Sequence, residues 1–260
     1  DLADLFVLDD FTTVNGAPGV RSIDKIKRNT SAGFPWRKSK KFFLKLVPPI
    51  HGMQDPVEVS PEILDRSNDI IQTYMKGIRA HPVFTAHLKD EAVTFSKAER
   101  KKTRVFTGAP FDWSLVVRKF YLSFVRVLQN NRLAFEAAVG TTAQSREWDG
   151  LYHYVTQQSP DHIVAGDFSA FDKRMPPVFI LAAFEIIIEV CALSGNFNEC
   201  DMKIMWGIAV DTAYPTVDFN GDLVEFYGSN ASGHHLTVII NSLVNSLYMR
   251  SVIVALSPSI

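Results

Sequence analysis

Apolar side chains recur at intervals of three and four residues in several long segments, and this spacing predicts the main helices. One helix is expected from a cap at Ser60, with Pro61 in its first turn, to about Lys76 before Gly77. A second helix begins with a capping Asp112. Its apolar positions at helical spacing are Leu115, Val116, Phe120, Phe124, Val127 and Leu128.

Two further helices are predicted nearer the C-terminus. The first covers residues 176–193, opens on two prolines and stops at Gly195. The second covers residues 233–256. Its segment 236–256 is long enough to cross a bilayer, but it is interrupted by Asn241, Asn245 and Arg250. We therefore expect a buried helix of the core and no direct membrane insertion.

Shorter patterns between these helices predict strands. Residues 162–168 form a short apolar run and predict a buried strand. Residues 214–219 and 223–227 flank Asn220-Gly221, the strongest short-range hairpin signal. From residue 160 onward the order is strand, helix, hairpin, helix, which favours an α+β fold over repeated βαβ units. The first hundred residues are broken by prolines and predict irregular structure.

Composition supports a folded chain. The 260 residues are 47% hydrophobic and 12% aromatic, which excludes a disordered chain and fits one large domain or two small ones. Two cysteines cannot build a disulfide framework, so a reducing compartment is expected. The first residue is Asp1 rather than Met, so we expect a piece of a longer chain or a processed product.

The net charge of −1 hides two basic islands. Residues 21–45 contain nine Lys and Arg against one Asp, and residues 97–104 contain five against one Glu. The rest of the chain then carries a net charge of −13. This distribution favours a polyanion held at defined places, whereas a single island would be explained by a solvated basic loop.

Asp167 and Asp172 are candidate carboxylate ligands. Residues five apart face opposite sides of a strand and lie about 140° apart on a helix, so these two converge only if the strand ends between them. An Asp at the end of a buried strand is a suitable hard ligand for Mg²⁺. The alternative is that Asp167 ends a strand and Asp172 caps a helix, and the pair alone favours that alternative.

A loop of small residues, 228–233, runs into the last predicted helix. Ser232 and Gly233 place backbone N–H groups and a hydroxyl at the helix start, and Thr237 and Asn241 share one helical face. The Asn241 amide offers a donor and an acceptor, which suits a sugar hydroxyl. The alternative is a polar stripe packed on a neighbouring helix. His234 and His235 are adjacent and diverge on a helix, so they make a poor metal pair.

Basic and hydroxyl side chains mark two further segments. A lysine offers a point charge to a triphosphate, and an arginine can bond two phosphate oxygens at once. The candidate triphosphate-binding residues are Lys89, Lys97, Lys101, Lys102 and Arg104. In Thr30-Ser-Ala-Gly-Phe-Pro35, Gly and Pro shape a tight loop whose hydroxyls and amides suit a nucleic-acid backbone. Taken separately, the two segments would be a solvated loop and a turn.

In this order and spacing, the four signals resemble the RNA-dependent RNA polymerases of picorna-like positive-strand RNA viruses. The segment 30–35 resembles that family's motif G, and 89–104 its motif F. Asp167-x4-Asp172 is similar to motif A, and Ser232-Gly-x3-Thr237-x3-Asn241-Ser242 to motif B. Motif B is highly specific in this form and motif A moderately so.

The resemblance implies a role for each matching residue. Asp167 would be catalytic and bind Mg²⁺, with Mn²⁺ as an alternative ion. Asp172 and Asn241 would read the ribose 2′-hydroxyl, and Ser232, Gly233 and Thr237 would position nucleotide and template. The triphosphate would be held by Lys89, Lys97, Lys102 and Arg104. The template path would be lined by Thr30, Ser31 and Gly33.

The resemblance also implies a right-hand polymerase fold of the α+β class, with fingers, an incomplete palm and no thumb. Residues 1–121 would be fingers, 122–210 the first part of the palm, 211–231 a fingers insertion with the hairpin, and 232–260 the palm segment of motif B. The family's motif C, with its Gly-Asp-Asp hairpin, should follow motif B, but the chain ends at Ile260. We therefore expect a partial polymerase that is inactive alone.

The implied reaction is template-directed RNA synthesis from ribonucleoside triphosphates, by two-metal phosphoryl transfer, for replication of a positive-strand RNA genome. Expected partners are template and product RNA, a protein primer and other viral replication proteins, in membrane-associated replication complexes of the host cytoplasm. Two alternatives stay open: a non-catalytic RNA-binding module, and a reverse transcriptase-like palm, which would want a bulky side chain at the sugar position.

Overall fold

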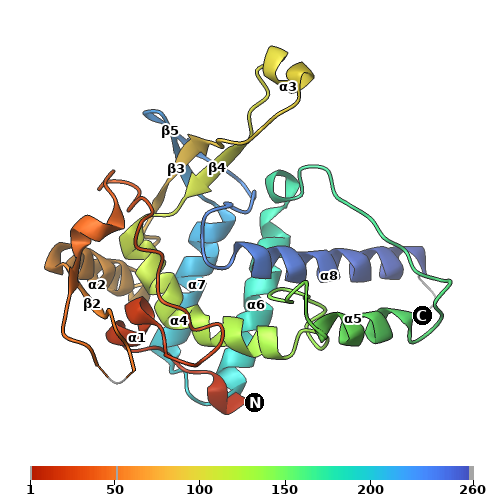
Figure 1. Cartoon of the computed structure of the whole chain (residues 1–260), viewed down its shortest axis with the longest axis horizontal. Helices are drawn as coiled ribbons and strands as arrows, with labels where there is room; N and C mark the ends of the chain where they lie inside the picture. Colours follow the sequence, from red (N-terminus) through yellow and green to blue (C-terminus); the bar gives the residue numbers. More distant parts are fainter. Residues whose placement is uncertain (1, 51, 258–260) are drawn as a thin grey trace.

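Long helices build the body of the protein. The structure is a computed structural model that describes residues 2–50 and 52–257. The helices are α1 (Asp10–Asn15), α2 (Pro61–Met75), α3 (Phe95–Glu99), α4 (Phe111–Asn130), α5 (Glu147–Thr156), α6 (Pro177–Leu193), α7 (Glu199–Ala213) and α8 (Thr237–Leu256). Short 3-10 turns lie at Leu2–Asp4, Lys40–Phe43 and Asp172–Arg174. Helices α4, α6 and α7 lie in the middle, where α2 packs on α4 and α7 from one side and α8 packs on α6 from the other (Figure 1).

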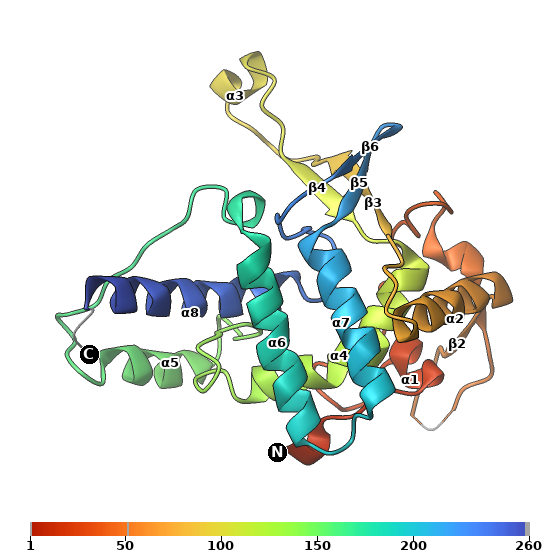
Figure 2. The same cartoon turned by 180° about the vertical axis from the view of Figure 1, so that it is seen from behind.

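Two sheets complete the fold. Strands β1 (Leu44–Leu46) and β2 (Val57–Val59) form an antiparallel pair. The larger sheet has the order β4-β3-β5-β6, from β3 (Val83–Leu88), β4 (Val105–Gly108), β5 (Thr216–Phe219) and β6 (Asp222–Glu225). Strand β3 is antiparallel to β4 and parallel to β5, so the sheet joins segments about 130 residues apart. Beyond β3 and β4 the chain extends outward and carries α3 at its tip (Figure 2).

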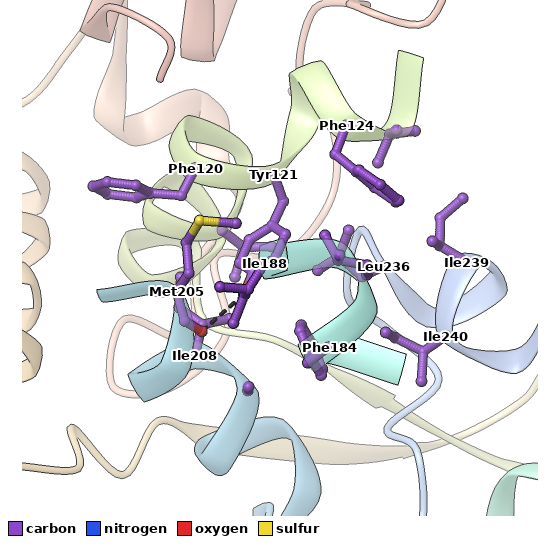
Figure 3. Close-up of a cluster of buried hydrophobic side chains, with 14 of the residues drawn as sticks. Phe120, Tyr121, Phe124, Phe184, Ile188, Met205, Ile208, Leu236, Ile239 and Ile240 are labelled. Carbon is purple, nitrogen blue, oxygen red and sulfur yellow. Dashed lines mark hydrogen bonds between the residues drawn. The ribbon is translucent and has the colours of Figure 1, made fainter. Parts of the chain in front are cut away.

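The core lies where α4, α6, α7 and the start of α8 meet. Phe120, Tyr121 and Phe124 of α4 face Phe184 and Ile188 of α6, Met205 and Ile208 of α7, and Leu236, Ile239 and Ile240 at the start of α8 (Figure 3). The buried Tyr121 hydroxyl donates to the Met205 carbonyl at 2.8 Å, so its polar atom is satisfied inside the core. This packing fixes the start of α8, and with it the loop that precedes α8.

Several predicted elements form as expected. The helices at 61–75 and 177–193 and the hairpin around Asn220-Gly221 are present, and both turn residues have positive φ. The predicted cap at Asp112 is wrong, because α4 begins at Phe111 and Pro110 occupies its N-cap position. Asp112 instead lies buried in the first turn and pairs with Arg66 at 2.7 Å.

The predicted strand at residues 162–168 does not form. In the described part of the chain this segment pairs with no strand, and Val164 is 97% exposed. A strand satisfies its backbone groups only against a neighbour, so apolar composition alone does not create one. The predicted boundary at residue 121 also falls inside the continuous helix α4.

Helix α8 is only half buried. Its first turns contribute Ile239, Ile240, Leu243 and Val244 to the core, whereas the apolar residues of its last two turns are exposed. The expectation of a buried core helix is therefore wrong for this second half. By length and composition α8 also meets the criteria for a membrane span, which a single helix of a soluble core can meet as well.

Candidate active site

Five segments line a cavity of about 620 Å³ beside the larger sheet. They are the end of β3 and start of β4, residues 168–173, the loop before α8, and the first turns of α8. Its polar lining residues are Lys89, Arg104, Asp172, Lys173, Ser232, Thr237 and Asn241. Six of these seven, all except Lys173, are among the residues predicted to hold a nucleotide.

Asp172 is held at this cavity through its backbone. The Asn230 N–H donates to the Asp172 carbonyl at 2.8 Å, and the Ser229 N–H donates to the Met175 carbonyl at 2.9 Å. Gly228 has φ +89°, and a Cβ there would lie 2.2 Å from the Met175 carbonyl oxygen. Only glycine tolerates both the positive φ and this approach, so Gly228 allows residues 172–175 to lie along the loop.

Ser232 and Gly233 attach the same loop to β4. The Ser232 hydroxyl accepts from the Thr107 N–H at 3.0 Å, and the Thr107 hydroxyl accepts from the Ser232 N–H at 3.1 Å. The Ala109 N–H donates to the Gly233 carbonyl at 3.3 Å. A Cβ on Gly233 would lie 1.7 Å from the Thr107 carbonyl oxygen, so the contact between loop and strand requires glycine.

The predicted triphosphate-binding residues divide into two groups. Lys89 and Arg104 line the cavity and share Glu91, at 3.0 and 3.4 Å. The hydrogen bond from Lys89, with the charge of Arg104, lowers the pKa of the Glu91 carboxyl. Lys97 and Lys102 instead lie at the projecting α3, exposed and outside the cavity lining (Figure 1).

Asp167 lies outside the cavity lining. It is exposed, and in the described residues it has no hydrogen bond or ion pair, while Phe168 next to it does line the cavity. No group of three or more His, Cys, Asp or Glu side chains in residues 2–50 and 52–257 is placed to hold a metal ion. The expected convergence of Asp167 with Asp172 at the end of a strand is therefore not seen.

The predicted RNA-binding residues lie at a second cavity, of about 920 Å³, and at its neighbour. Thr30 and Ser31 line the larger one, while Ser31 and Gly33 line an adjoining cavity of about 350 Å³. The Thr30 hydroxyl accepts from the Lys40 ammonium at 3.0 Å. Gly33 has φ +70°, and a Cβ there would lie 3.0 Å from the Pro110 Cα. The loop therefore packs tightly against the start of α4.

Positive charge gathers in the larger cavity. Its lining includes Lys25, Lys27, Lys40 and Arg118. Burial, together with the charge of Arg118, lowers the pKa of Lys40 to about 8, and burial lowers that of Arg118 to about 10. The charge of Arg118 disfavours the charged form of Lys40, so an anion such as a phosphodiester would stabilise the Lys40 ammonium.

Sequence reasoning missed residues that support the site. Asn230, Thr107, Lys40 and Arg118 were not singled out, and His234 was considered only as a poor metal ligand. Asn230 could have been noticed as the one amide in the small-residue loop ahead of Ser232. The pairing of Thr107 with Ser232 has no local sequence signal, because the two residues are 125 positions apart.

Comparisons with known proteins agree on one family. The family model for viral RNA-dependent RNA polymerase matches residues 7–257. The chain is 28% identical over 231 residues to the replicase polyprotein of Acute bee paralysis virus, covering 88% of this chain and 12% of that polyprotein. It is 29% identical over 245 residues to the genome polyprotein of Deformed wing virus, covering 90% of this chain and 8% of the polyprotein.

A solved structure shares the fold. The Sicinivirus 3Dpol RNA dependent RNA polymerase superposes with a TM-score of 0.73 at 20% identity, over 94% of this chain and 48% of that one. The predicted α+β polymerase fold is confirmed by this likeness. The chain thus spans about half of that polymerase and about a tenth of the two polyproteins.

Proposed function

The chain belongs to the viral RNA-dependent RNA polymerase family, and we propose that it is the part of such an enzyme that binds template RNA and the incoming ribonucleotide. The whole enzyme would carry out template-directed RNA synthesis in replication of a positive-strand RNA genome. One observation carries this proposal: Asp172 and Asn241, 69 positions apart, line one cavity together with Lys89 and Arg104. That cavity combines groups for a ribose with groups for a triphosphate.

The cationic side of the cavity suits the triphosphate. The Arg104 guanidinium can fork two phosphate oxygens, and the Lys89 ammonium adds a point charge. Both side chains pair with the single carboxylate of Glu91, which leaves one positive charge in excess for a phosphate. Phosphoryl transfer depends on alignment and charge neutralisation more than on covalent chemistry, so these contacts are what the reaction needs from this part of the chain.

Two other lining residues, Asp172 and Asn241, suit the sugar. The Asp172 carboxylate can accept a hydrogen bond from a ribose hydroxyl, and the Asn241 amide can pair with the same hydroxyl. A deoxyribose lacks that group and would leave the polar atoms unpaired. Selection of ribonucleotides over deoxyribonucleotides follows from that difference.

Mg²⁺, with Mn²⁺ as an alternative, is part of the proposal. Mg²⁺ takes one or two carboxylates and completes its shell with phosphate oxygens and water. The Asp167 carboxylate is exposed and is a hard ligand, so it fits such a role. In residues 2–50 and 52–257 it has no second and third acidic, His or Cys side chain beside it to complete a metal site. When bound with the nucleotide, the ion would neutralise charge on the transferring phosphate.

The basic cavity suits the template. Lysine and arginine supply sequence-independent affinity for phosphates, and Thr30 and Ser31 add hydroxyl contacts at the same wall. A protein primer and a membrane-associated replication complex of the host cytoplasm belong to the proposal as partners of the complete enzyme.

A non-catalytic RNA-binding module is the second candidate function, and the position of Asp167 outside the cavity favours it. Incorporation of labelled ribonucleotides by the complete polymerase containing this chain separates the two. Asp167→Ala should lower incorporation by about 10²-fold or more while RNA affinity and the melting temperature stay unchanged. Asp161→Ala, a free exposed carboxylate on the same segment, is the matched control and should retain activity. Incorporation retained in Asp167→Ala would remove the catalytic assignment.

A further inference from the structure

Asn230 is 1% exposed, and both its backbone N–H and its side-chain amide are paired. Its backbone N–H donates to the Asp172 carbonyl at 2.8 Å. Its Nδ2 donates to the Thr237 carbonyl at 3.0 Å and to Asn241 Oδ1 at 2.8 Å. Its Oδ1 lies 2.9 Å from His234 Nε2. One buried residue therefore contacts both members of the pair proposed to read the sugar.

The direction of these hydrogen bonds is fixed by backbone groups at both ends. The Thr237 carbonyl can only accept, so the Asn230 atom facing it is the amide nitrogen. At the other end the Leu236 N–H donates to His234 Nδ1 at 3.2 Å, which leaves the ring proton on Nε2 and aims it at Asn230 Oδ1. Neither amide nor imidazole can be reversed without placing two donors or two acceptors together.

His234 keeps this arrangement at neutral pH. Its ring is buried and lies edge-on to the Trp113 ring, at 6.1 Å between centroids. Burial lowers the pKa of His234 to about 3, so the ring stays neutral and Nδ1 remains an acceptor.

The orientation of Asn241 follows from this chain of bonds. Because Asn230 Nδ2 is a donor, Asn241 must present Oδ1 to it, and the Asn241 amide nitrogen is left for the cavity. In the described residues that nitrogen donates to no protein acceptor. The pair proposed to read the sugar therefore offers the cavity a donor, on Asn241, and an acceptor, the Asp172 carboxylate. A hydroxyl group, which donates one hydrogen bond and accepts others, is complementary to both.

We propose that Asn230 is a positioning residue for ribose selection: it fixes the Asn241 amide nitrogen toward the cavity and holds the Asp172 backbone beside it. This inference rests on the proposed polymerase function and deepens it. Asn230 does not itself line the cavity, so it acts through Asn241 and Asp172.

The test compares ribonucleotide with 2′-deoxyribonucleotide incorporation by the complete polymerase. Asn230→Asp keeps the size, the backbone N–H and the acceptor for His234, but it cannot donate to Asn241. Asn230→Ser is the second variant and avoids a buried charge if the first does not fold. Each should lower kcat/KM for the ribonucleotide about three- to tenfold, the effect of losing one oriented neutral hydrogen bond, with little change for the deoxyribonucleotide. Ser229→Ala, in the same loop, should leave both values unchanged.

A double-mutant cycle tests the route of action. If Asn230 works through Asn241, then Asn230→Ser added to Asn241→Ala should cause no further loss of selectivity. An equal fall for both sugars in Asn230→Ser would show a merely structural role and overturn the inference, as would unchanged selectivity. A wild-type polymerase that incorporates neither nucleotide would instead overturn the proposed function, and this inference with it.

Discussion

The contact between Gly233 and β4 gives the most direct prediction. In Gly233→Ala the new methyl group would lie 1.7 Å from the Thr107 carbonyl oxygen, 2.8 Å from its carbonyl carbon and 3.1 Å from the Gly108 Cα. All three atoms belong to the backbone, so no side-chain rotation relieves the overlap. The loop before α8 must move away from the strand by more than 1 Å, a distance of the order that breaks hydrogen bonds.

The cost can be worked from the bonds that this movement breaks. Three hydrogen bonds join the loop to β4, two between Ser232 and Thr107 and one from the Ala109 N–H to the Gly233 carbonyl. Each contributes a net 0.5–1.5 kcal/mol, so about 1.5–4.5 kcal/mol is at risk. Because Ser232 also lines the cavity proposed to bind the nucleotide, the same movement changes the cavity wall.

The assay is thermal unfolding of the complete polymerase together with ribonucleotide incorporation. Gly233→Ala should lower the melting temperature and reduce incorporation. Gly150→Ala, in helix α5, is the matched control: a Cβ there meets nothing within 4 Å, and alanine favours a helix. A Gly233→Ala enzyme with unchanged melting temperature and activity would refute the close approach on which the reasoning stands.

Three further predictions concern the sugar, the template and the core. Asn241→Ala should relax selection of ribonucleotides over 2′-deoxyribonucleotides, measured by competing incorporation; unchanged discrimination would show that the sugar-reading role is wrong. Lys40, with its pKa lowered to about 8, should lose charge as the pH rises from 7 to 9, so RNA affinity should fall more steeply for the wild type than for Lys40→Gln. Because folding lowers the pKa of Lys40, the folded state binds fewer protons than the unfolded chain between about pH 8 and 10.5. The free energy of unfolding should therefore rise with pH in this range. A Lys40→Gln variant whose free energy of unfolding has the same slope against pH would contradict this. Tyr74→Phe removes a buried hydrogen bond of 2.7 Å to Asp211 and should destabilise the protein by about 1–3 kcal/mol by thermal unfolding, whereas exposed Tyr152→Phe should not; equal melting temperatures would count against the buried bond.

Helices were predictable where the sequence carries both a period and an end signal. Residues 177–193 have the opening prolines and the closing glycine, and the structure ends the helix where expected. Helix α7 was missed although its start carries a capping box, in which Asn198 and Asp201 bond each other's backbone N–H groups. The sequence therefore contains the local signal that predicts where α7 begins.

Only the β5–β6 hairpin of the larger sheet could be predicted from a short stretch of sequence. The Asn220-Gly221 turn predicts β5 and β6, because these two residue types readily adopt the positive φ that both turn positions have. Its neighbours β3 and β4 lie in a proline-broken region, and the parallel pairing of β3 with β5 joins residues 83–85 to 216–218. Such pairing depends on the packing of the whole chain, and no periodicity within a short window encodes it.

The candidate site, too, could be predicted only in part from the sequence. Composition and spacing left Asp172 and Asn241 as two separate polar groups, and only the family resemblance placed them in one cavity. The structure adds the physical link, since Asn230 bonds the backbone of one and the side chain of the other. Asn230 stands out in the sequence as the one amide of its loop, but its contact with Asp172 has no local sequence signal, so its supporting role becomes visible only in the structure.

The two ends of the segment 162–175 differ in how firmly they are held, and this explains why Asp172 lines the cavity and Asp167 does not. Residues 172–175 are bonded to the loop before α8, and Phe171 packs on Tyr248 of α8 at 5.7 Å between ring centroids. The part of the cavity proposed to read the sugar is therefore held by contacts among the described residues. Residues 162–167 have no strand partner among the described residues that would hold Asp167 at the same cavity. Substitutions at Asn230 should therefore change the selection of ribonucleotides over deoxyribonucleotides, and they should leave any metal-dependent role of Asp167 unchanged.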